Sequence, residues 1–383
     1  MWSTPGGKLD LEPPPALLAP ENRCPQNRSP PLMGATSTDQ KVRRVVITTY
    51  LEPELVSQLS SEFPEFEWVY PIELLALPRY AGEHRRPSAI SNESAAKWRE
   101  HLESAEVLFD FGPAPLHREL AGSRNLRWIQ ATSAGVGQFV HSVGLDQPQT
   151  PLVTTARGVH GQALAEFVVM ALIALNRDLP QMFRDQSARR WVRGAGCLVA
   201  GQLVCIVGLG SIGQRVAVAL RPFGAHTIGI VHSKGHRTAS DLGVDELYSQ
   251  DELDQVLPRA DVLVLSCPHT KETEGLINSR RLGLLPQSSV VINIARGMVI
   301  DEGALIRKLA DGDLRGAALD VAAREPLPAD SPLWTLPNVI ISPHSASTVD
   351  GENQAIAELF RLNLRAYLAG QPLTNLLDKQ RLY

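Results

Sequence analysis

Four side chains that could take part in chemistry follow short apolar runs in the second half of the chain. "NIARGMVIDEGAL" places Arg296 after one run, "GAALDVAAREPLP" places Asp320 and Glu325 after the next, and "NVIISPHSAS" places His344 after the last. Functional groups of a parallel sheet gather beyond the carboxyl ends of its strands. An arginine, two acids and a histidine at such positions could together reduce a 2-keto acid.

Each of these residues also has a structural interpretation. A single histidine after a strand is more often structural, Glu325 could be a solvated charge, Asp320 a helix cap, and Arg296 an ion-pair partner. What favours catalysis is their joint occurrence after successive strands. Three further histidines lack an acid-partner context and are left outside the expected catalytic set: His160, His232 and His269.

A glycine loop earlier in the chain is typical of dinucleotide binding. Gly208, Gly210 and Gly213 form GxGxxG between the apolar run "LVCIV" and the helix-compatible "QRVAVALRPFG". In that context the glycines permit a tight turn, close approach of backbone to pyrophosphate, and close helix–strand packing. Ser211 and Ile212 lie within the loop, where helix N-terminal amides would bind the diphosphate. The alternative is a glycine-rich turn without a ligand.

The elements that must position these residues form two alternating series. Strands are expected in 43–49, 66–71, 105–112 and 126–135, with helices in 52–63 and 95–102. A long helical pattern in 161–191, interrupted by Pro180, precedes the second series: "QLVCIVGLG", "AHTIGIV", "ADVLVLSCP", "SSVVINIA", "RGAALDV" and "NVIISPH". An amphipathic helix in 349–370, capped by Gly370, ends the pattern. The alternation predicts an α/β protein with parallel sheets.

Composition limits the class of protein. The chain has 383 residues, enough for two domains, with 44% hydrophobic residues and a formal net charge of −4. A nucleic-acid-binding surface would be basic, and a membrane span needs about 18 apolar residues in a row, so neither partner is expected. Cys205 and Cys267 are expected in the core, which fits a reducing, cytoplasmic location. Residues 1–40 are rich in proline and serine and are expected to be a disordered leader.

With these motifs in hand, the sequence resembles the D-isomer-specific 2-hydroxyacid dehydrogenase family over nearly all of 43–383. The resemblance rests on GLGSIG, "CPHTKETEGLIN", "INIARGMVIDEGAL", "ALDVAAREPLP" and "ISPHSAS", in the family's order. It implies that Arg296 binds the substrate carboxylate and polarises the carbonyl. It further implies that His344 is the acid of the reduction, and that Glu325 orients His344 and favours its protonated form.

The resemblance also implies a fold of two Rossmann-like or flavodoxin-like domains with the active site in the cleft between them. Residues 41–155 with 346–383 would form the substrate (cap) domain, and 156–345 the dinucleotide-binding domain. Asp320 would contact the nicotinamide carboxamide. The "TSAGVG" turn would hold the substrate carboxylate through the amides of Ala134, Gly135 and Val136.

Two departures from the family pattern lie near the expected site. Gly137 stands where an aspartate often follows the SAGV-like turn, which removes any polar contact from that side chain. Ala322 and Ala323 stand where family members commonly carry a bulky residue after "ALDV". The second departure leaves the size of the substrate open.

The segment "IGIVHSKGHR" bears on the choice of cofactor. Val231 occupies the place of the acid that usually accepts hydrogen bonds from the adenosine ribose and would repel a 2′-phosphate. Ser233, Lys234 and Arg237 follow and could accommodate that phosphate. NADP(H) is therefore expected to be preferred and NAD(H) to remain possible. A solvated basic loop with continued use of NAD is the alternative.

The sequence thus predicts a reductase of small 2-keto acids, such as glyoxylate or hydroxypyruvate, that uses a nicotinamide dinucleotide. The apolar surface of the helices in 161–191 predicts a homodimer. The competing hypothesis is a dinucleotide-sensing interaction protein of the corepressor type, because such relatives can keep the same arginine, glutamate and histidine.

Overall fold

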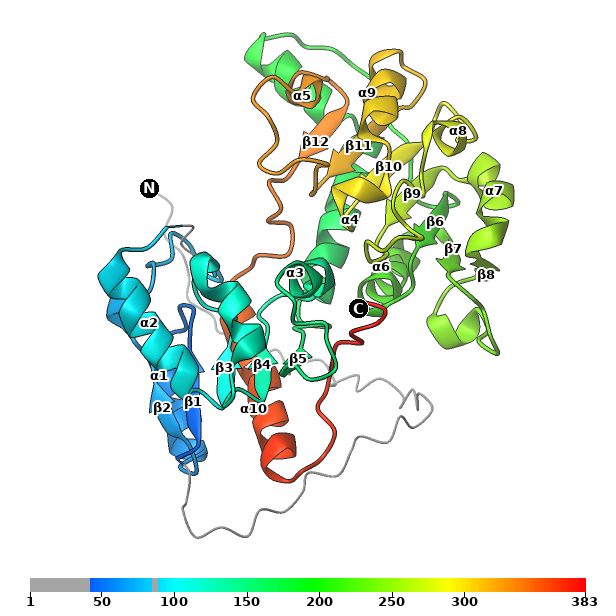
Figure 1. Ribbon diagram of the computed structural model, residues 1–383. Helices are drawn as coiled ribbons and strands as arrows, with labels where there is room; N and C mark the ends of the chain where they lie inside the picture. Colours follow the sequence, from blue (N-terminus) through cyan, green and yellow to red (C-terminus); the bar gives the residue numbers. More distant parts are fainter. Residues whose placement is uncertain (1–41, 85–88) are drawn as a thin grey trace, which may run out of the picture. The chain divides into compact units, whose positions relative to one another are not determined.

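The computed structural model describes residues 42–84 and 89–383, in which two parallel β-sheets carry the helices (Figure 1). The expected leader, residues 1–40, lies outside the described residues. Both sheets contain parallel strand pairs throughout, as βαβ crossovers require. The α/β class and the parallel sheets predicted from the sequence are confirmed.

The first sheet has five strands in the order β2-β1-β3-β4-β5. Their bounds are Arg44–Ile47 (β1), Glu67–Val69 (β2), Val107–Phe109 (β3), Trp128–Gln130 (β4) and Leu152–Thr154 (β5). Helices α1 (Pro53–Glu62) and α10 (Glu352–Leu368) share a core with one face of this sheet. On the other face lie α2 (Asn92–Ser104), the 3₁₀ segment η2 (Ala114–Gly122) and α3 (Gly137–Ser142).

The second sheet has seven strands in the order β12-β11-β10-β9-β6-β7-β8. Their bounds are Leu203–Val207 (β6), His226–Val231 (β7), Glu246–Ser249 (β8), Val262–Leu265 (β9), Val290–Asn293 (β10), Gly316–Leu319 (β11) and Val339–Ile341 (β12). Strand order reverses beside β6, which has β9 on one side and β7 on the other. Ligands of open α/β sheets bind at such a switch point, and here the glycine loop directly follows β6.

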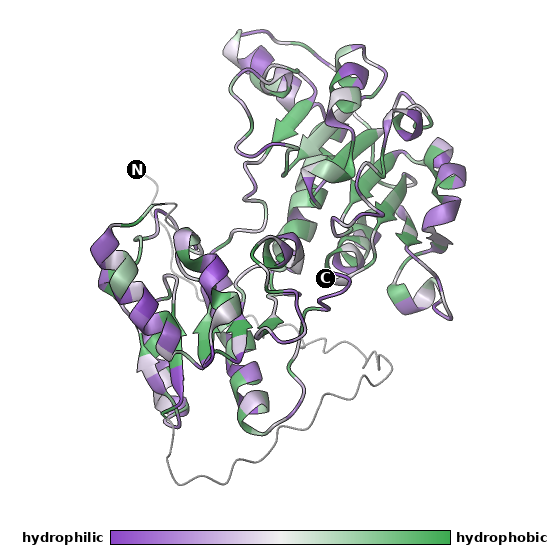
Figure 2. Cartoon of the chain, viewed as in Figure 1, coloured by the Kyte–Doolittle hydropathy of each residue, from purple (hydrophilic) through white to green (hydrophobic). Residues whose placement is uncertain are grey.

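Burial explains why these strands read as continuous apolar runs. Both faces of the second sheet are covered, one by α4 (Gly161–Asn176) and α6 (Ser211–Leu220), the other by α7 (Leu253–Val256), α8 (Ser279–Leu282) and α9 (Glu302–Ala310). Figure 2 shows the result, with apolar strands inside and helices that are polar on their outer sides. Cys205 and Cys267 are buried in this core, as the sequence predicted.

The long helical pattern in 161–191 is interrupted, as expected, and forms two helices, but the interruption lies just before Pro180 rather than at it. Helix α4 ends at Asn176, and α5 spans Leu179–Ser187. The break is made by Asp178, which has a left-handed backbone with φ of 53°. Pro180 lies in the first turn of α5, where its missing N–H costs nothing.

The elements without a counterpart in the sequence prediction include β5, β8 and α3. Each is short, and the strand β8 is only half-buried, so its apolar pattern is weak. The helix in 349–370 is present as α10, and Gly370 follows it with φ of 63°, as expected for a C-terminal cap. In the described part of the chain, every helix is too short or too polar to cross a membrane.

Candidate active site

His344 and Glu325 meet although they follow different strands. Nδ1 of His344 lies 2.7 Å from Oε2 of Glu325, and both side chains are partly open to solvent. Burial raises the pKa of Glu325, but the hydrogen bond and charge of His344, with smaller contributions from Ala322 N–H and Arg296, outweigh burial and lower it overall. This arrangement holds the Glu325 carboxylate against Nδ1 of His344 and leaves Nε2 of the same ring for a reacting atom.

The loop that carries His344 is held by Asp320. Oδ1 of Asp320 accepts hydrogen bonds from Ser342 Oγ at 2.8 Å and from the amides of Ser345 and Ala346 at 2.9 Å. The Asp320 carbonyl accepts the His344 N–H at 2.8 Å. His344 itself has φ of 53°, a left-handed conformation that costs a non-glycine residue about 1–3 kcal/mol. These contacts keep the histidine in that conformation.

Arg296 follows β10, and its guanidinium contacts the turn after β4. Nη2 donates to the Gly135 carbonyl at 3.0 Å, and Nη1 donates to the carbonyl of Ala295 at 2.7 Å. Burial lowers the pKa of Arg296, while the negative charges of Glu325 and Asp320 raise it. Glu325 and Asp320 are also the residues that contact His344 and its loop. The guanidinium has five N–H groups, so donors remain for a ligand.

The glycine loop between β6 and α6 has the form that the motif predicts. Gly208 has φ of 95°, and a Cβ on Gly213 would overlap the Gly208 carbonyl oxygen, so both positions need glycine. Gly210 faces open space. It precedes Ser211 and Ile212 at the start of α6, and it gives the helix no side-chain cap. The first amides of α6 are thus available for an anion.

The basic residues after β7 differ in what they contact. Lys234 Nζ lies 2.6 Å from Oε2 of Glu252, and this hydrogen bond, followed by those from Ser249, lowers the pKa of Glu252 to about 2. Arg237 is exposed and folds back on the carbonyls of Ser233 and Lys234. Val231 is buried at the end of the strand. The ion pair occupies Lys234, which leaves Arg237 as the cation without a carboxylate partner among these described residues.

One expectation about the histidines was wrong. His160 was set aside because it lacked an acid partner, but its Nε2 lies 2.9 Å from Oε1 of Glu352. The two residues are 192 positions apart, so local sequence could not show the contact. His269 also has an acid within 3.7 Å, Glu274. The His160–Glu352 pair is buried, whereas a proton donor for a substrate must be reachable. This difference still favours His344.

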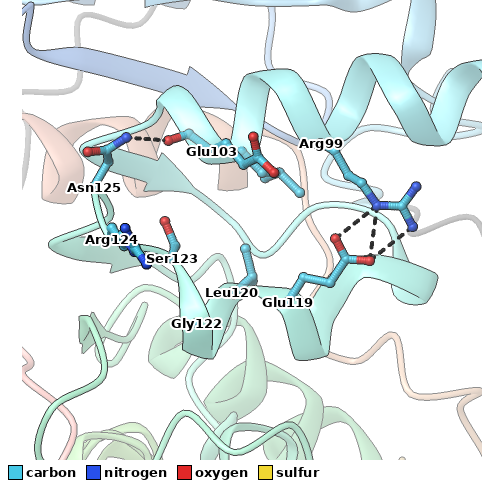
Figure 3. Close-up of a pocket in the computed structure, with 9 residues that line it drawn as sticks. Arg99, Glu103, Glu119, Leu120, Gly122, Ser123, Arg124 and Asn125 are labelled. Carbon is cyan, nitrogen blue, oxygen red and sulfur yellow. Dashed lines mark hydrogen bonds and ion pairs between the residues drawn. The ribbon is translucent and has the colours of Figure 1, made fainter.

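A surface pocket elsewhere in the first sheet's helices contains none of the residues singled out above. It lies between α2 and η2 and is lined at one end by an ion pair in which Arg99 contacts both carboxylate oxygens of Glu119 (Figure 3). Asn125 donates to the Glu103 carbonyl at its other end. Exposed ion pairs of this kind contribute little to stability, and the pocket offers no proton-transfer pair.

Two supporting residues escaped the sequence analysis. Ser342, two positions before His344, donates to Asp320, and Glu302 accepts the Ala323 N–H at 2.8 Å and so anchors the loop that leads to Glu325. Glu302 follows Asp301, which caps α9. The Asp-Glu pair at a helix start was a readable capping signal, but its reach to Ala323 needed the tertiary structure.

Comparison with known proteins connects this geometry to a family. Residues 169–346 match the family model described as "D-isomer specific 2-hydroxyacid dehydrogenase, NAD binding domain". A glyoxylate reductase of Thermofilum pendens is 34% identical over 253 residues, which cover 63% of this chain and 74% of that protein.

Solved structures show the same similarity over more of the chain. A D-isomer specific 2-hydroxyacid dehydrogenase family protein from Aeromonas salmonicida subsp. salmonicida superposes with a TM-score of 0.71 at 29% identity, covering 88% of this chain and 99% of that one. An NADPH-dependent glyoxylate/hydroxypyruvate reductase from Sinorhizobium meliloti, in complex with NADP and sulfate, gives a TM-score of 0.70 at 25% identity, with 89% and 100% coverage.

Proposed function

The chain belongs to the family of D-isomer specific 2-hydroxyacid dehydrogenases, NAD(P)-dependent oxidoreductases that act on the CH–OH group, and we propose that it reduces small 2-keto acids such as glyoxylate or hydroxypyruvate. The observation that carries the proposal is the 2.7 Å contact of His344 with Glu325, in the electrostatic reach of Arg296. The names of the Thermofilum and Sinorhizobium proteins support the choice of substrate.

In this proposal each residue has one task during reduction. Arg296 binds the substrate carboxylate with the N–H groups that Ala295 and Gly135 leave unused, and it polarises the keto oxygen. Glu325 holds Nδ1 of His344, so Nε2 donates its proton to that oxygen as the carbonyl carbon is reduced. The amides of Ala134, Gly135 and Val136 add donors for the carboxylate. In the oxidation of the hydroxy acid, Nε2 takes the proton back.

The described residues fit a nicotinamide dinucleotide. A Cβ at Gly210 would project into the open space beside the first turn of α6, where the backbone has to approach a diphosphate. When bound, the dinucleotide supplies the hydride. Asp320 Oδ1 is occupied by the His344 loop, so a contact with the carboxamide would use the other oxygen, Oδ2.

NADPH is the proposed preferred form, and NADH can also serve. Val231 offers no carboxylate to repel a 2′-phosphate, and Ser233 and Arg237 are exposed next to it. Lys234 would join them only after giving up Glu252, which makes Arg237 the first candidate for the phosphate. The NADP complex of the Sinorhizobium enzyme is in line with this choice.

The proposed domain division places the site where the loops of the two sheets meet. Residues 41–155 with 346–383 include β1–β5 and α10, and residues 156–345 include β6–β12 with α4 and α6. Arg296 donates to Gly135, and Gln138 donates to the His269 carbonyl at 3.3 Å, so both contacts join these groups of residues. Free thiols at Cys197, Cys205 and Cys267 support the proposed cytoplasmic location.

A second copy of this chain is the proposed partner of the apolar surface on α4, α5 and 191–198. Every residue of 191–198 is exposed, including Trp191 at 96%, and Leu198 lines a groove with Ile173 and Phe223. The same surface includes Met170, Met182 and Phe183. Large contiguous apolar patches are uncommon on monomers, and a two-fold dimer would bury these side chains against those of the second copy.

Light scattering tests the dimer. Replacing both Trp191 and Leu198 with serine should shift the mass from two chains to one, whereas L77S, at an exposed leucine between β2 and α2, should leave it unchanged. A wild-type protein that is monomeric at micromolar concentration contradicts the proposal.

A substrate matrix tests the proposed activity. NADPH and NADH oxidation is measured against glyoxylate, hydroxypyruvate, pyruvate and bulkier 2-keto acids, and we expect the highest kcat/KM for a small keto acid with NADPH. If none of these acids is turned over while the dinucleotide still binds, the interaction-protein hypothesis replaces the enzyme.

A further inference from the structure

The last residues of the chain return to the first sheet and extend it. The amide of Leu377 donates to the Val153 carbonyl at 2.8 Å, the Thr155 amide donates to the Asn375 carbonyl at 3.0 Å, and Leu376 forms an antiparallel bridge with Thr154. Residues 375–377 thus pair with β5, which is otherwise an edge strand. The pairing fixes where the remaining residues can go.

Lys379 fastens the next part of this C-terminal segment. Its ammonium donates to three oxygens, the carbonyls of Gln147 and Thr150 at 3.0 and 2.9 Å and the Thr150 hydroxyl at 2.7 Å. Burial lowers the pKa of Lys379, with Asp146 acting in the opposite direction. These three hydrogen bonds fix the position of the half-buried Lys379 ammonium, whereas an ammonium on a freely solvated tail would have no fixed position.

The segment ends in a tight turn against Gly137. Oδ1 of Asp378 accepts from the amides of Gln380 and Arg381, and the Asp378 carbonyl accepts the Leu382 N–H at 2.7 Å. A Cβ on Gly137 would overlap the carbonyl oxygen of Leu382. The backbone of Leu382 therefore fills the volume that any side chain at position 137 would need.

Gly137 lies inside the turn that meets Arg296. Two positions before it, the Gly135 carbonyl accepts from Arg296, and one position after it, Gln138 donates to the carbonyl of His269. Leu382 therefore abuts the turn between its two contacts with loops of the second sheet. If the segment were displaced, Gly137 would lose its contact with Leu382, and the backbone that carries the Gly135 carbonyl and Gln138 would be less restrained.

We propose that residues 378–383 are a positioning element for the substrate-binding turn 132–137, and that they take the place of the aspartate that relatives often carry at position 137. The inference rests on the proposed function, because it assumes that the amides of this turn hold the carboxylate of a 2-keto acid. With the segment in place, the carbonyl of Leu382 packs against the turn at Gly137. Without it, the amides lose their fixed direction, and ground-state binding of the acid weakens.

Removal of residues 380–383 tests the proposal, because it deletes the Leu382 contact and keeps Lys379. We expect KM for the preferred keto acid to rise about tenfold or more while the Kd of NADPH changes less than twofold. In the full-length chain, G137S should have the same effect, because its side chain displaces the segment. Q371A, at an exposed residue outside the segment, is the control and should behave as wild type.

Hydrogen–deuterium exchange supplies a readout that does not depend on turnover. The truncated chain should exchange faster than the full chain in residues 131–142 and equally in residues 203–214, which contain the glycine loop. Unchanged exchange in 131–142 overturns the positioning role. If exchange changes as expected but no keto acid is reduced by either protein, the positioning role stands and the proposed function fails. If KM and NADPH binding worsen together, the segment acts on overall folding and the proposal is wrong.

Discussion

Nδ1 of His344 and Oε2 of Glu325 lie 2.7 Å apart, although the two residues follow different strands and are separated by 19 positions. The contact exists because two loops are held independently. Asp320 accepts hydrogen bonds from the loop that carries His344, and Glu302 accepts one from Ala323 in the loop that leads to Glu325. A short contact between two restrained and partly exposed groups is what proton transfer needs.

Replacing His344 with glutamine should remove the acid of the reduction. We expect kcat for the keto acid to fall about 10²–10⁴-fold, because glutamine fills a similar volume but transfers no proton at neutral pH. NADPH binding, followed by fluorescence, should stay within twofold of wild type because the glycine loop lies after a different strand. Near-full turnover in this variant would show that another group supplies the proton.

The pH dependence should report Glu325. Its pKa is lowered, so the carboxylate is ionised above its ordinary value of about 4.5, and the stabilisation it gives is lost as pH falls through the lowered value. Between about pH 5 and 8 the charge on Glu325 is therefore constant, so kcat/KM for reduction should not vary with its ionisation in that range. E325Q keeps the shape of the side chain and loses its charge, so it should remove the acid limb of the kcat/KM profile below about pH 5. An acid limb that persists in E325Q would show that another group titrates there.

Arg296 should be needed for substrates with a carboxylate. R296K keeps the positive charge but loses the planar pair of donors, and we expect kcat/KM to fall about 10–100-fold. R99K is the matched control, because it changes the same type of side chain in the surface pocket, which contains none of the candidate site residues, and it should have no effect. An unchanged kcat/KM in R296K contradicts the assigned role.

The strands that precede the candidate residues could be predicted because each rests on local pattern. Arg296 and Glu325 follow the buried runs "VVIN" and "GAAL", His344 follows the half-buried but apolar "VII", and the glycine loop follows "LVCIV". Short or half-buried elements such as β5 and β8 carry too little apolar pattern to be recognised.

Contacts across long sequence separations could not be predicted. His160 with Glu352, Lys234 with Glu252, and Leu382 against Gly137 depend on how the chain returns to itself. The last of these also gives a physical reason for the missing aspartate at position 137, which the sequence presented only as a departure. Single residue types show which chemistry is possible, but the pairing that directs it is a tertiary property.

Cofactor preference should turn on the charge at position 231. Val231 is buried at the end of β7, so V231D introduces both a charge and the cost of burying a polar group. V231N introduces a polar group of similar shape without the charge and is the matched control. We expect V231D to shift the NADPH/NADH ratio of kcat/KM towards NADH by about tenfold or more, since a carboxylate repels the 2′-phosphate. V231N should leave the ratio within about threefold of wild type.

The same assay ranks the two cations after β7. R237A should lower kcat/KM with NADPH and leave the value with NADH unchanged, because only NADPH carries the phosphate. K234A should have the smaller effect, because the Lys234 ammonium is engaged by Glu252 at 2.6 Å. A larger loss in K234A than in R237A would show that the ion pair opens on binding and that Lys234 is the residue that reaches the phosphate.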